Sequence, residues 1–556
     1  RLLPHGLPCG NHPITKFMSQ LSLVDLASIA VYLVVLAAVT LWVNLKIGGA
    51  DAEHYFLGGR SVPFWAIGFS LFASNLGTDH LVGLAGSGAS TGLVAGNYEW
   101  SASYTLLLLA WVFVPHYLDR KIYTVPEYLE KRFSVRFRVF FTWLTIFATA
   151  VTKISVTIYS GGIVLEAVLG WNMWLSSIGL LALTAVYTTI GGLAAVVYTE
   201  VLQSIILLVG SLAVLWFGLR EVGGIQALHD QLPASQFRLL KPLNDPDFPW
   251  LGVILGMPIG SIWYWCTDQV MVQRVLAAQD VATSQRACVF AGWLKVLPMY
   301  IMVLPGLIAA ALYPADVQQD SNKAFALLIT RVLPHGWQGT IIAVMLSSFM
   351  AALASAFNSC STLFTMDVYV RWVPGHTDAQ VVLVGRLFTV VVAVLSLAWL
   401  PIISHSGSDQ LFIYIQEMQI IWSAPVVTVF LASIISDTVS EWTAWWTLMT
   451  GLVVSAHVWL FRQFAKGCSG FFLCPLINMN ILNFSILLMG FDVLVMCILH
   501  FFAEGYRTPS EHLPLMSKQP EVKEVAEQRV AGPVTKMCAA ALLATVVFLT
   551  IWHSLP

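Results

Sequence analysis

The chain has 556 residues, of which 58% are hydrophobic and only 10% are charged, whereas soluble proteins carry about 25% charged residues. Most of the chain is therefore expected to lie in lipid, and a formal net charge of −2 gives no basis for a nucleic-acid partner. No soluble domain fits between the apolar segments, so neither a receptor with a large ectodomain nor a cytoplasmic enzyme module is expected.

Apolar segments long enough to cross a bilayer follow one another along almost the whole chain. A bilayer core of about 30 Å needs about 20 apolar residues in a helix. About fourteen segments qualify, which predicts an all-α, polytopic membrane protein. They lie near 23–45, 63–90, 99–118, 138–168, 172–190, 194–219, 249–271, 284–313, 337–369, 381–403, 410–435, 441–461, 477–503 and 534–554. The first is too long for a signal peptide, and a polar tail precedes it.

Lysine and arginine predict which loops face the cytoplasm. The loop after the third segment, "DRKIYTVPEYLEKRFSVRFR", is strongly basic and is expected inside, which places both chain ends outside. The acidic stretch Ser436 to Glu441 is expected on the same side and opposes this rule. The polar segment 504–532 resembles a flexible cytoplasmic connector.

The cysteines give no zinc-binding pattern. Only Cys468 and Cys474 lie close together, in a short connection between two segments. A disulfide there would require an extracellular face, and a reduced pair is equally consistent with the sequence.

Three polar residues interrupt the segment 63–90, namely Asn75, Asp79 and His80. Ionisable groups at membrane depth are costly and usually face a cavity or a partner. Gly77 and Gly83 favour local unwinding of this helix, as in the broken helices with which secondary transporters bind substrates and ions. The alternative is that Asn75 and Asp79, four residues apart, share one helix face and bond to a neighbouring helix.

Further polar and aromatic groups occur in other segments. Glu99 opens the third, where it could also simply complement the helix dipole. The others are Lys153, Tyr264, Trp265, Asp268, Lys295 and Gln416. Carboxylate, amide, imidazole and ammonium groups together with flat rings suit sugars and polyols, which combine many hydroxyls with an apolar face. Hydrolysis is disfavoured, because no second carboxylate lies within helix reach of Glu99.

Several longer stretches resemble the sodium/solute symporter family, and within it the sodium/glucose and sodium/myo-inositol cotransporters. The matching stretches are "YFLGGRSVPFWAIGFSLFASN", "VGLAGSGAS", "TVPEYLEKRF", "TKIS", "YTTIGGLAAVVYTEVLQ", "WYWCTDQVMVQRVLAA", "FNSCSTLFTMDVY" and "YIQE". They run in family order from about residue 55 to 430.

This resemblance implies a leucine-transporter-type fold and alternating access. An extra N-terminal helix would span 22–46, the two inverted five-helix repeats 63–219 and 249–435, and extra C-terminal helices 441–556. The family's sugar pocket would map to Asn75, His80, Glu99, Tyr264, Trp265, Lys295 and Gln416. Tyr264 would be the inner gate that stacks on the sugar ring.

The family's central sodium site is degraded in this chain. Its carbonyl ligands would map to Ala73, Leu76 and Ser348, but its two adjacent serines map to Ala351 and Ala352. A hard cation needs oxygen ligands. Losing two hydroxyls should weaken sodium binding by a few kcal/mol, or about a hundredfold. Asp79, Glu200 and Asp268 are the candidate carboxylates of a proton or ion route, because a buried carboxylate can bind a proton where sodium no longer binds.

Three hypotheses follow. The first is a hexose or polyol carrier whose sodium coupling is weak or lost, working as a uniporter or driven by protons. The second is an ordinary sodium-coupled glucose or myo-inositol symporter. The third is a sugar sensor that transports little. All three place the chain in the plasma membrane, in contact with lipid and with no cofactor beyond Na+ or H+. None is an enzyme, and an accessory subunit is left open.

Overall fold

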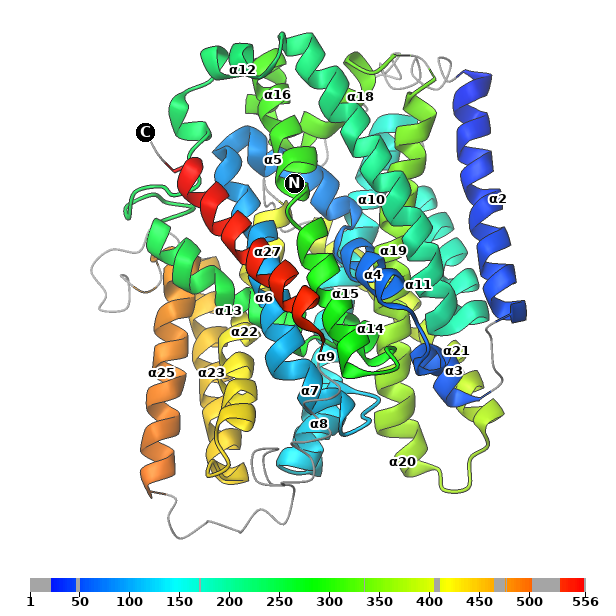
Figure 1. Cartoon of the computed structure of the whole chain (residues 1–556), viewed down its shortest axis with the longest axis vertical. Helices are drawn as coiled ribbons and strands as arrows, with labels where there is room; N and C mark the ends of the chain where they lie inside the picture. Colours follow the sequence, from blue (N-terminus) through cyan, green and yellow to red (C-terminus); the bar gives the residue numbers. More distant parts are fainter. Residues whose placement is uncertain are drawn as a thin grey trace, which may run out of the picture.

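The computed structural model describes residues 22–46, 51–169, 172–334, 336–404, 411–464, 476, 478–502 and 531–554. In these ranges the fold is built from helices, and the extended pairing is an isolated bridge between Lys241 and Pro249. Ten helices are long and apolar enough to cross a membrane. They stand roughly upright in one bundle (Figure 1). The all-α, polytopic expectation is therefore confirmed.

The first predicted repeat begins with two short helices instead of one long helix. Its helices are α4 (Phe64–Asn75), α5 (Thr78–Thr91), α6 (Asn97–Leu108), α7 (Val114–Leu118), α9 (Val135–Ala148), α10 (Ser155–Leu169) and α11 (Met173–Val222). π-Helical turns, which often mark functional sites, join α6 to α7 at Leu109–Phe113 and α9 to α10 at Thr149–Ile154.

The second predicted repeat also begins with an interrupted helix. Its helices are α13 (Met257–Ile262), α14 (Gln269–Leu276), α15 (Val281–Leu294), α16 (Leu304–Leu312), α19 (Gln338–Phe364), α21 (Asp378–Ser404) and α22 (Leu411–Ile435). A π-helical turn at Trp263–Thr267 precedes α14. Short helices α12 (Ile225–Gln231), α17 (Pro314–Gln319) and α18 (Ala324–Arg331) fill the longer connections.

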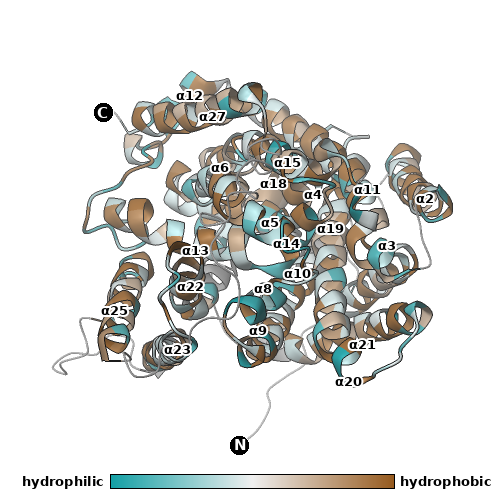
Figure 2. Cartoon of the chain, turned by 60° about the horizontal axis from the view of Figure 1, so that its bottom comes forward, coloured by the Kyte–Doolittle hydropathy of each residue, from teal (hydrophilic) through white to brown (hydrophobic). Residues whose placement is uncertain are grey.

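Four further long helices stand around these elements. They are α2 (Leu23–Lys46), α23 (Glu441–Phe464), α25 (Ile481–Phe502) and α27 (Pro533–Trp552). In Figure 1, α2 forms the right edge and α25 the left edge of the bundle. Figure 2 shows the hydrophobic colour along these outer helices and more hydrophilic residues on α5, α10 and α14 near the middle.

The break between α4 and α5 confirms the expected unwinding. Leu76 has a non-helical backbone (φ −88°, ψ 77°), and Gly77 is extended. The break lies among buried residues, including Ala73, Asn75 and Leu76, as expected because unwound backbone at membrane depth is tolerated only in a buried or water-lined place.

The helix α11 contains the two segments expected at 172–190 and 194–219, separated by a break at Gly192. This glycine has φ 61° and ψ −163°. Positive φ favours glycine, and a Cβ at this position would lie 2.6 Å from the carbonyl oxygen of Tyr55. Gly192 thus permits both the break and the close approach of helix α3 (Ala52–Leu57).

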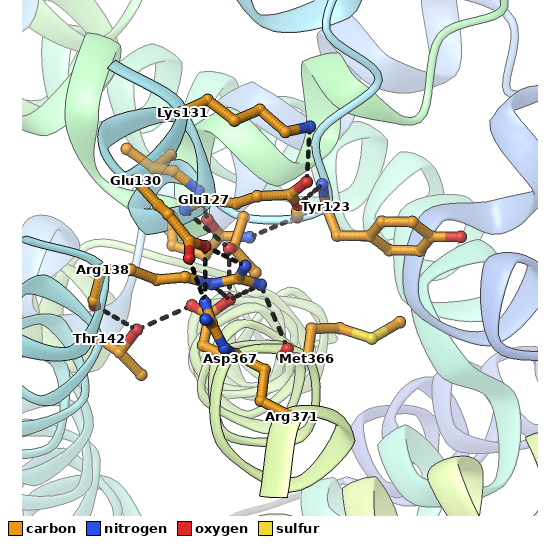
Figure 3. A network of polar contacts seen from close by, with 12 residues as sticks. Tyr123, Glu127, Glu130, Lys131, Arg138, Thr142, Met366, Asp367 and Arg371 are labelled. Atoms are coloured by element: carbon orange, nitrogen blue, oxygen red, sulfur yellow. Dashed lines mark hydrogen bonds and ion pairs between the residues drawn. The ribbon is translucent and has the colours of Figure 1, made fainter. Parts of the chain in front are cut away.

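A polar network ties one end of α9 and α19 to the short helix α8 (Val125–Arg132), as Figure 3 shows. Asp367 accepts hydrogen bonds from Thr124 (2.7 Å), Arg138 (2.8 Å) and Thr142 (2.8 Å). Glu130 accepts from Arg138 and Arg371, each at 2.6 Å. The basic loop expected in the cytoplasm is therefore fixed to the ends of two core helices.

The acidic loop 436–440 lies beside this basic loop, on the side expected for it. The guanidinium of Arg132 donates to the carbonyl oxygens of Ser433, Ser436 and Val439, and Ser134 donates to Glu441 at 2.5 Å. These contacts hold the two loops together, so both lie at the same end of the bundle. Residues 504–530 of the expected connector and the pair Cys468 and Cys474 lie outside the described residues.

Candidate functional site

A cavity in the middle of the bundle gathers most of the residues expected to bind a sugar. Five of the seven predicted residues line it, namely Asn75, His80, Glu99, Tyr264 and Trp265. They come from both sides of the α4–α5 break, from the start of α6, and from the π-helical turn before α14. The cavity has a volume of about 70 Å³, several times the room that one water needs.

The sixth predicted residue, Lys295, lies behind the cavity wall and binds two residues of that wall. Its ammonium donates to Glu99 Oε2 at 2.6 Å and to Asn75 Oδ1. It is fully buried, with its ammonium 5.2 Å from the ring centre of Trp265 and 5.8 Å from that of Phe72. Lys295 therefore fixes the carboxylate and the amide, while the cavity itself is lined by those two groups.

His80 completes this group at the start of α5. Its Nε2 lies 3.4 Å from Asn75 Nδ2 and 3.8 Å from Glu99 Oε1. Four polar side chains from four separate elements thus converge within a few ångströms. Because Lys295 and Glu99 form a buried ion pair, the group adds no net charge to the cavity when His80 is neutral.

Two further lining residues of this cavity, Tyr264 and Lys153, pair with each other. The ammonium donates to the phenol oxygen at 2.8 Å and lies 4.7 Å from the ring centre. Lys153 sits in the π-helical turn between α9 and α10, so the pair joins the first predicted repeat to the second. The edge-to-face contact of Tyr264 with Trp265, at 5.3 Å, further restrains the ring.

A second cavity of about 30 Å³ lies on the other side of Tyr264. Its wall includes Thr267 and Asp268, together with Trp422 from α22. Both cavities share four lining residues, which are Thr152, Lys153, Tyr264 and Gln419. Tyr264 and its lysine partner therefore stand at the boundary between the two cavities.

The central cavity combines hydrogen-bonding groups with aromatic surface. Amide, carboxylate and imidazole groups can each bind a hydroxyl, and the rings of Tyr264 and Trp265 offer apolar faces. Ser101, Ser261 and Thr157 add hydroxyls to the lining. Such a wall suits a small, neutral molecule with several hydroxyls and an apolar face.

The residues at the predicted sodium site offer few oxygens. Ala73, Leu76 and Ser348 are buried, as are Ala351 and Ala352. The hydroxyl of Ser348 donates to the carbonyl oxygen of Leu76, and the carbonyl oxygen of Ala73 accepts from the amide of Leu76 at 3.1 Å. Ala352 also lines the central cavity. The side chains at the two predicted serine positions therefore end in methyl groups, which cannot serve as ligands of a hard cation.

Glu200, predicted on a proton or ion route, is fully buried and has several partners. Ser70 and Ser355 donate to its two oxygens, and Arg274, also fully buried, lies 3.3 Å away. This cluster joins α4, α11, α14 and α19. Glu200 lines neither of the two cavities described above.

Asp268 lies at the second cavity and caps α14, where its carboxylate accepts from the amide of Val270 at 3.1 Å. The side chains of Asp79 and Gln416 lie outside the described residues. Gln419, one turn beyond Gln416 on α22, lines both cavities. Gln419 is not among the predicted pocket residues, although it stands beside Gln416 in the polar stretch "YIQEMQ".

Comparisons with known proteins agree with this architecture. A model of the sodium:solute symporter family matches residues 55–451. Sodium/glucose cotransporter 4 of Mus musculus is 39% identical, with 86% of this chain and 76% of that protein covered. Sodium/glucose cotransporter 1 of Mus musculus is 37% identical, with coverages of 90% and 81%. Sodium/glucose cotransporter 2 of Rattus norvegicus is 36% identical, with coverages of 92% and 83%.

Solved structures support the fold. A Na+-coupled sialic acid symporter in a substrate-bound, outward-open state superposes with a TM-score of 0.75 at 20% identity, covering 88% of this chain and all of that chain. A nucleobase-cation-symport-1 family transporter in a closed conformation superposes with a TM-score of 0.56 at 14% identity, covering 86% and 98%. The leucine-transporter-type architecture expected from the sequence is thereby confirmed.

Proposed function

Because the chain belongs to the sodium:solute symporter family, we propose that it carries a hexose or a related polyol across the plasma membrane by alternating access. It is an integral, multi-pass membrane protein with ten described helices long and apolar enough to cross a bilayer. The named relatives are sodium/glucose cotransporters, which makes a sugar the first substrate to test.

One observation carries the proposal, namely the convergence of Asn75, His80 and Glu99 on a cavity that faces the Tyr264 ring. Hydroxyls of the substrate would bind to the three polar groups, and the apolar face of its ring would lie against the aromatic side. Lys295 would act through Glu99 and Asn75, since it lies behind them. Gln416 keeps its predicted role as a hydroxyl ligand on the basis of the sequence resemblance alone.

We propose further that sodium coupling is weak or absent. The two alanines at positions 351 and 352 remove hydroxyl ligands, and the Ser348 hydroxyl bonds to one of the remaining carbonyls. Glu200 is a weak candidate for a replacement proton carrier, because Arg274 neutralises it and two serines bond to its oxygens. With Glu200 disfavoured, transport would be uniport or would be coupled to protons through Asp79 or Asp268.

Transport in proteoliposomes tests this function. Uptake of labelled glucose and labelled myo-inositol would be measured in sodium, in choline, and across an imposed pH step. The proposal expects saturable uptake of at least one compound that differs little between sodium and choline. Concentrative, sodium-dependent uptake would instead identify an ordinary symporter, and sugar-induced current without uptake would identify a sensor. Absence of binding to either compound would reject the sugar site.

A further inference from the structure

A groove on the apolar outer side of the bundle is lined by α9 and by Trp445 of α23, and it shares no residue with the central cavity. Its volume is about 670 Å³. Four large apolar side chains follow one face of α9 at intervals of four residues, and each is 43% to 54% exposed. They are Val135, Val139, Trp143 and Phe147. Grooves of this size are in the range that binds small apolar molecules.

The floor of the groove is aromatic and well packed. The ring of Trp445 on α23 meets the rings of Phe137 and Phe140 on α9 edge to face, each at 5.5 Å. α9 and α23 begin on the same side, because Ser134 bonds to Glu441 there. The groove is thus an open, shallow surface of α9 that Trp445 of α23 borders, and it starts beside the basic loop.

A single cation stands at the end of the groove nearest the basic loop. The guanidinium of Arg136 lies over the ring of Trp445 at 5.1 Å from its centre, and Arg136 also lines the groove. Among the described residues it has no carboxylate within ion-pair distance. Glu441, the acidic residue at the start of α23, accepts a hydrogen bond from Ser134 instead.

The dimensions match one leaflet of a membrane. At 1.5 Å per residue, the apolar stripe from Val135 to Phe147 is about 18 Å long, and half of a bilayer core is about 15 Å thick. An acyl chain that followed the stripe would place its headgroup at Arg136. Because the basic side of a membrane protein faces the cytoplasm, that headgroup belongs to the leaflet rich in anionic lipids.

We propose that this groove is a binding site for an anionic phospholipid of the inner leaflet, with an acyl chain along the α9 stripe and the phosphate or carboxylate at Arg136. One lining residue, Leu144, also lines the second cavity below Tyr264. A lipid in the groove would therefore contact the outer surface of the wall that bounds the inner part of the transport path.

Native mass spectrometry of the detergent-purified full chain tests the site, with phosphatidylserine and phosphatidylcholine of the same acyl composition as the added lipids. Wild type is expected to bind one phosphatidylserine in preference to phosphatidylcholine. Arg136→Gln should weaken phosphatidylserine binding about fivefold, which corresponds to one basic residue at an anionic surface, and should leave phosphatidylcholine binding unchanged. The matched control is Arg286→Gln, which removes an exposed arginine of α15 outside the groove.

A second pair of variants tests the groove itself. Val139→Trp fills the apolar stripe and should reduce binding of both lipids at this site, whereas Val390→Trp, on the exposed face of α21, should reduce neither. Thermal unfolding of each variant establishes that it is folded. If Arg136→Gln and Arg286→Gln lost phosphatidylserine binding equally, the proposal would be overturned. It would also be overturned if soluble glycerophosphoserine competed for the site as effectively as phosphatidylserine does.

Discussion

The ammonium of Lys153 donates a 2.8 Å hydrogen bond to the hydroxyl of Tyr264, and both residues line the central cavity and the cavity below it. The two residues are 111 positions apart and come from different predicted repeats. Movement of one repeat relative to the other would therefore break or re-form this contact. In the proposed transport function, the tyrosine ring would serve both as a surface for the substrate and as the partition between the two cavities.

Tyr264 is expected to be essential for uptake. Tyr264→Ala should abolish labelled-sugar uptake, because it removes the stacking surface and the partition together. Tyr264→Phe should retain part of it, because the ring stays and only the bond to Lys153 is lost. Uptake is normalised to the amount of transporter at the cell surface. Equal uptake by the alanine variant and wild type would show that substrate does not pass this ring.

The buried pair of Lys295 and Glu99 should stabilise the fold only as a pair. Glu99→Gln leaves a buried ammonium without its carboxylate and should lower the free energy of unfolding by about 3 to 5 kcal/mol. The double variant Glu99→Gln with Lys295→Met should recover much of this loss while uptake stays abolished. Thermal unfolding in detergent measures the first effect, and the uptake assay measures the second.

A surface ion pair provides the control for that experiment. Arg331 and Asp316 lie 2.7 Å apart with both side chains more than 40% exposed. Arg331→Gln should change stability by less than about 1 kcal/mol. If Glu99→Gln were no more damaging than Arg331→Gln, the buried pair would not hold the cavity wall together.

Restoring the missing hydroxyls should restore a response to sodium. In the double variant Ala351→Ser with Ala352→Ser, two oxygens return to the predicted ion site, and the apparent sodium affinity of uptake should rise by about a hundredfold. The control is Ala356→Ser, which adds a hydroxyl one turn further along α19. An unchanged sodium response in the double variant would contradict the assignment of this site.

The network at the basic end of the bundle should make stability depend on acid. Burial tends to raise the pKa of Glu130, but hydrogen bonds from Arg371 and Arg138 outweigh burial and hold the pKa below its ordinary value of 4.5. The stabilisation from Glu130 is therefore fully present above pH 4.5 and is lost as the pH falls toward the lowered pKa. Acid should thus weaken the attachment of α8 to α9 and to Arg371 in the segment that follows α19.

Glu130→Gln tests this pH dependence. At neutral pH the variant should be less stable by about 1 kcal/mol, because Arg371 is partly exposed and water screens its charge. The difference from wild type should shrink as the pH is lowered to about 4. Thermal unfolding at the two pH values measures this difference in stability. The control is Asp378→Asn, which removes an exposed carboxylate at the start of α21. A difference that grows in acid would contradict the lowered pKa.

Much of the site was predictable because polar residues are rare in segments that lie in lipid. Polar residues such as Asn75 and Glu99 stand out against apolar segments, and Gly77 indicated where the helix would unwind. The structure brings Asn75, His80, Glu99, Tyr264 and Trp265 to one cavity, as the resemblance implied. Lys295 differs, because its position behind Glu99 depends on how α15 packs against α6, and neither residue type nor spacing reveals that packing.

The chain's sequence alone determined that it is a bundle of membrane-crossing helices, since a hydrocarbon solvent forces every apolar segment to satisfy its backbone within a helix. It also determined which side chains must avoid lipid. Only the tertiary structure decided which of these polar groups meet. Three contacts join residues more than a hundred positions apart, namely Lys153 with Tyr264, Lys295 with Glu99, and Arg132 with the acidic loop 436–440. Helical periodicity predicts which face of its helix each residue occupies, but it does not predict which helix packs against that face.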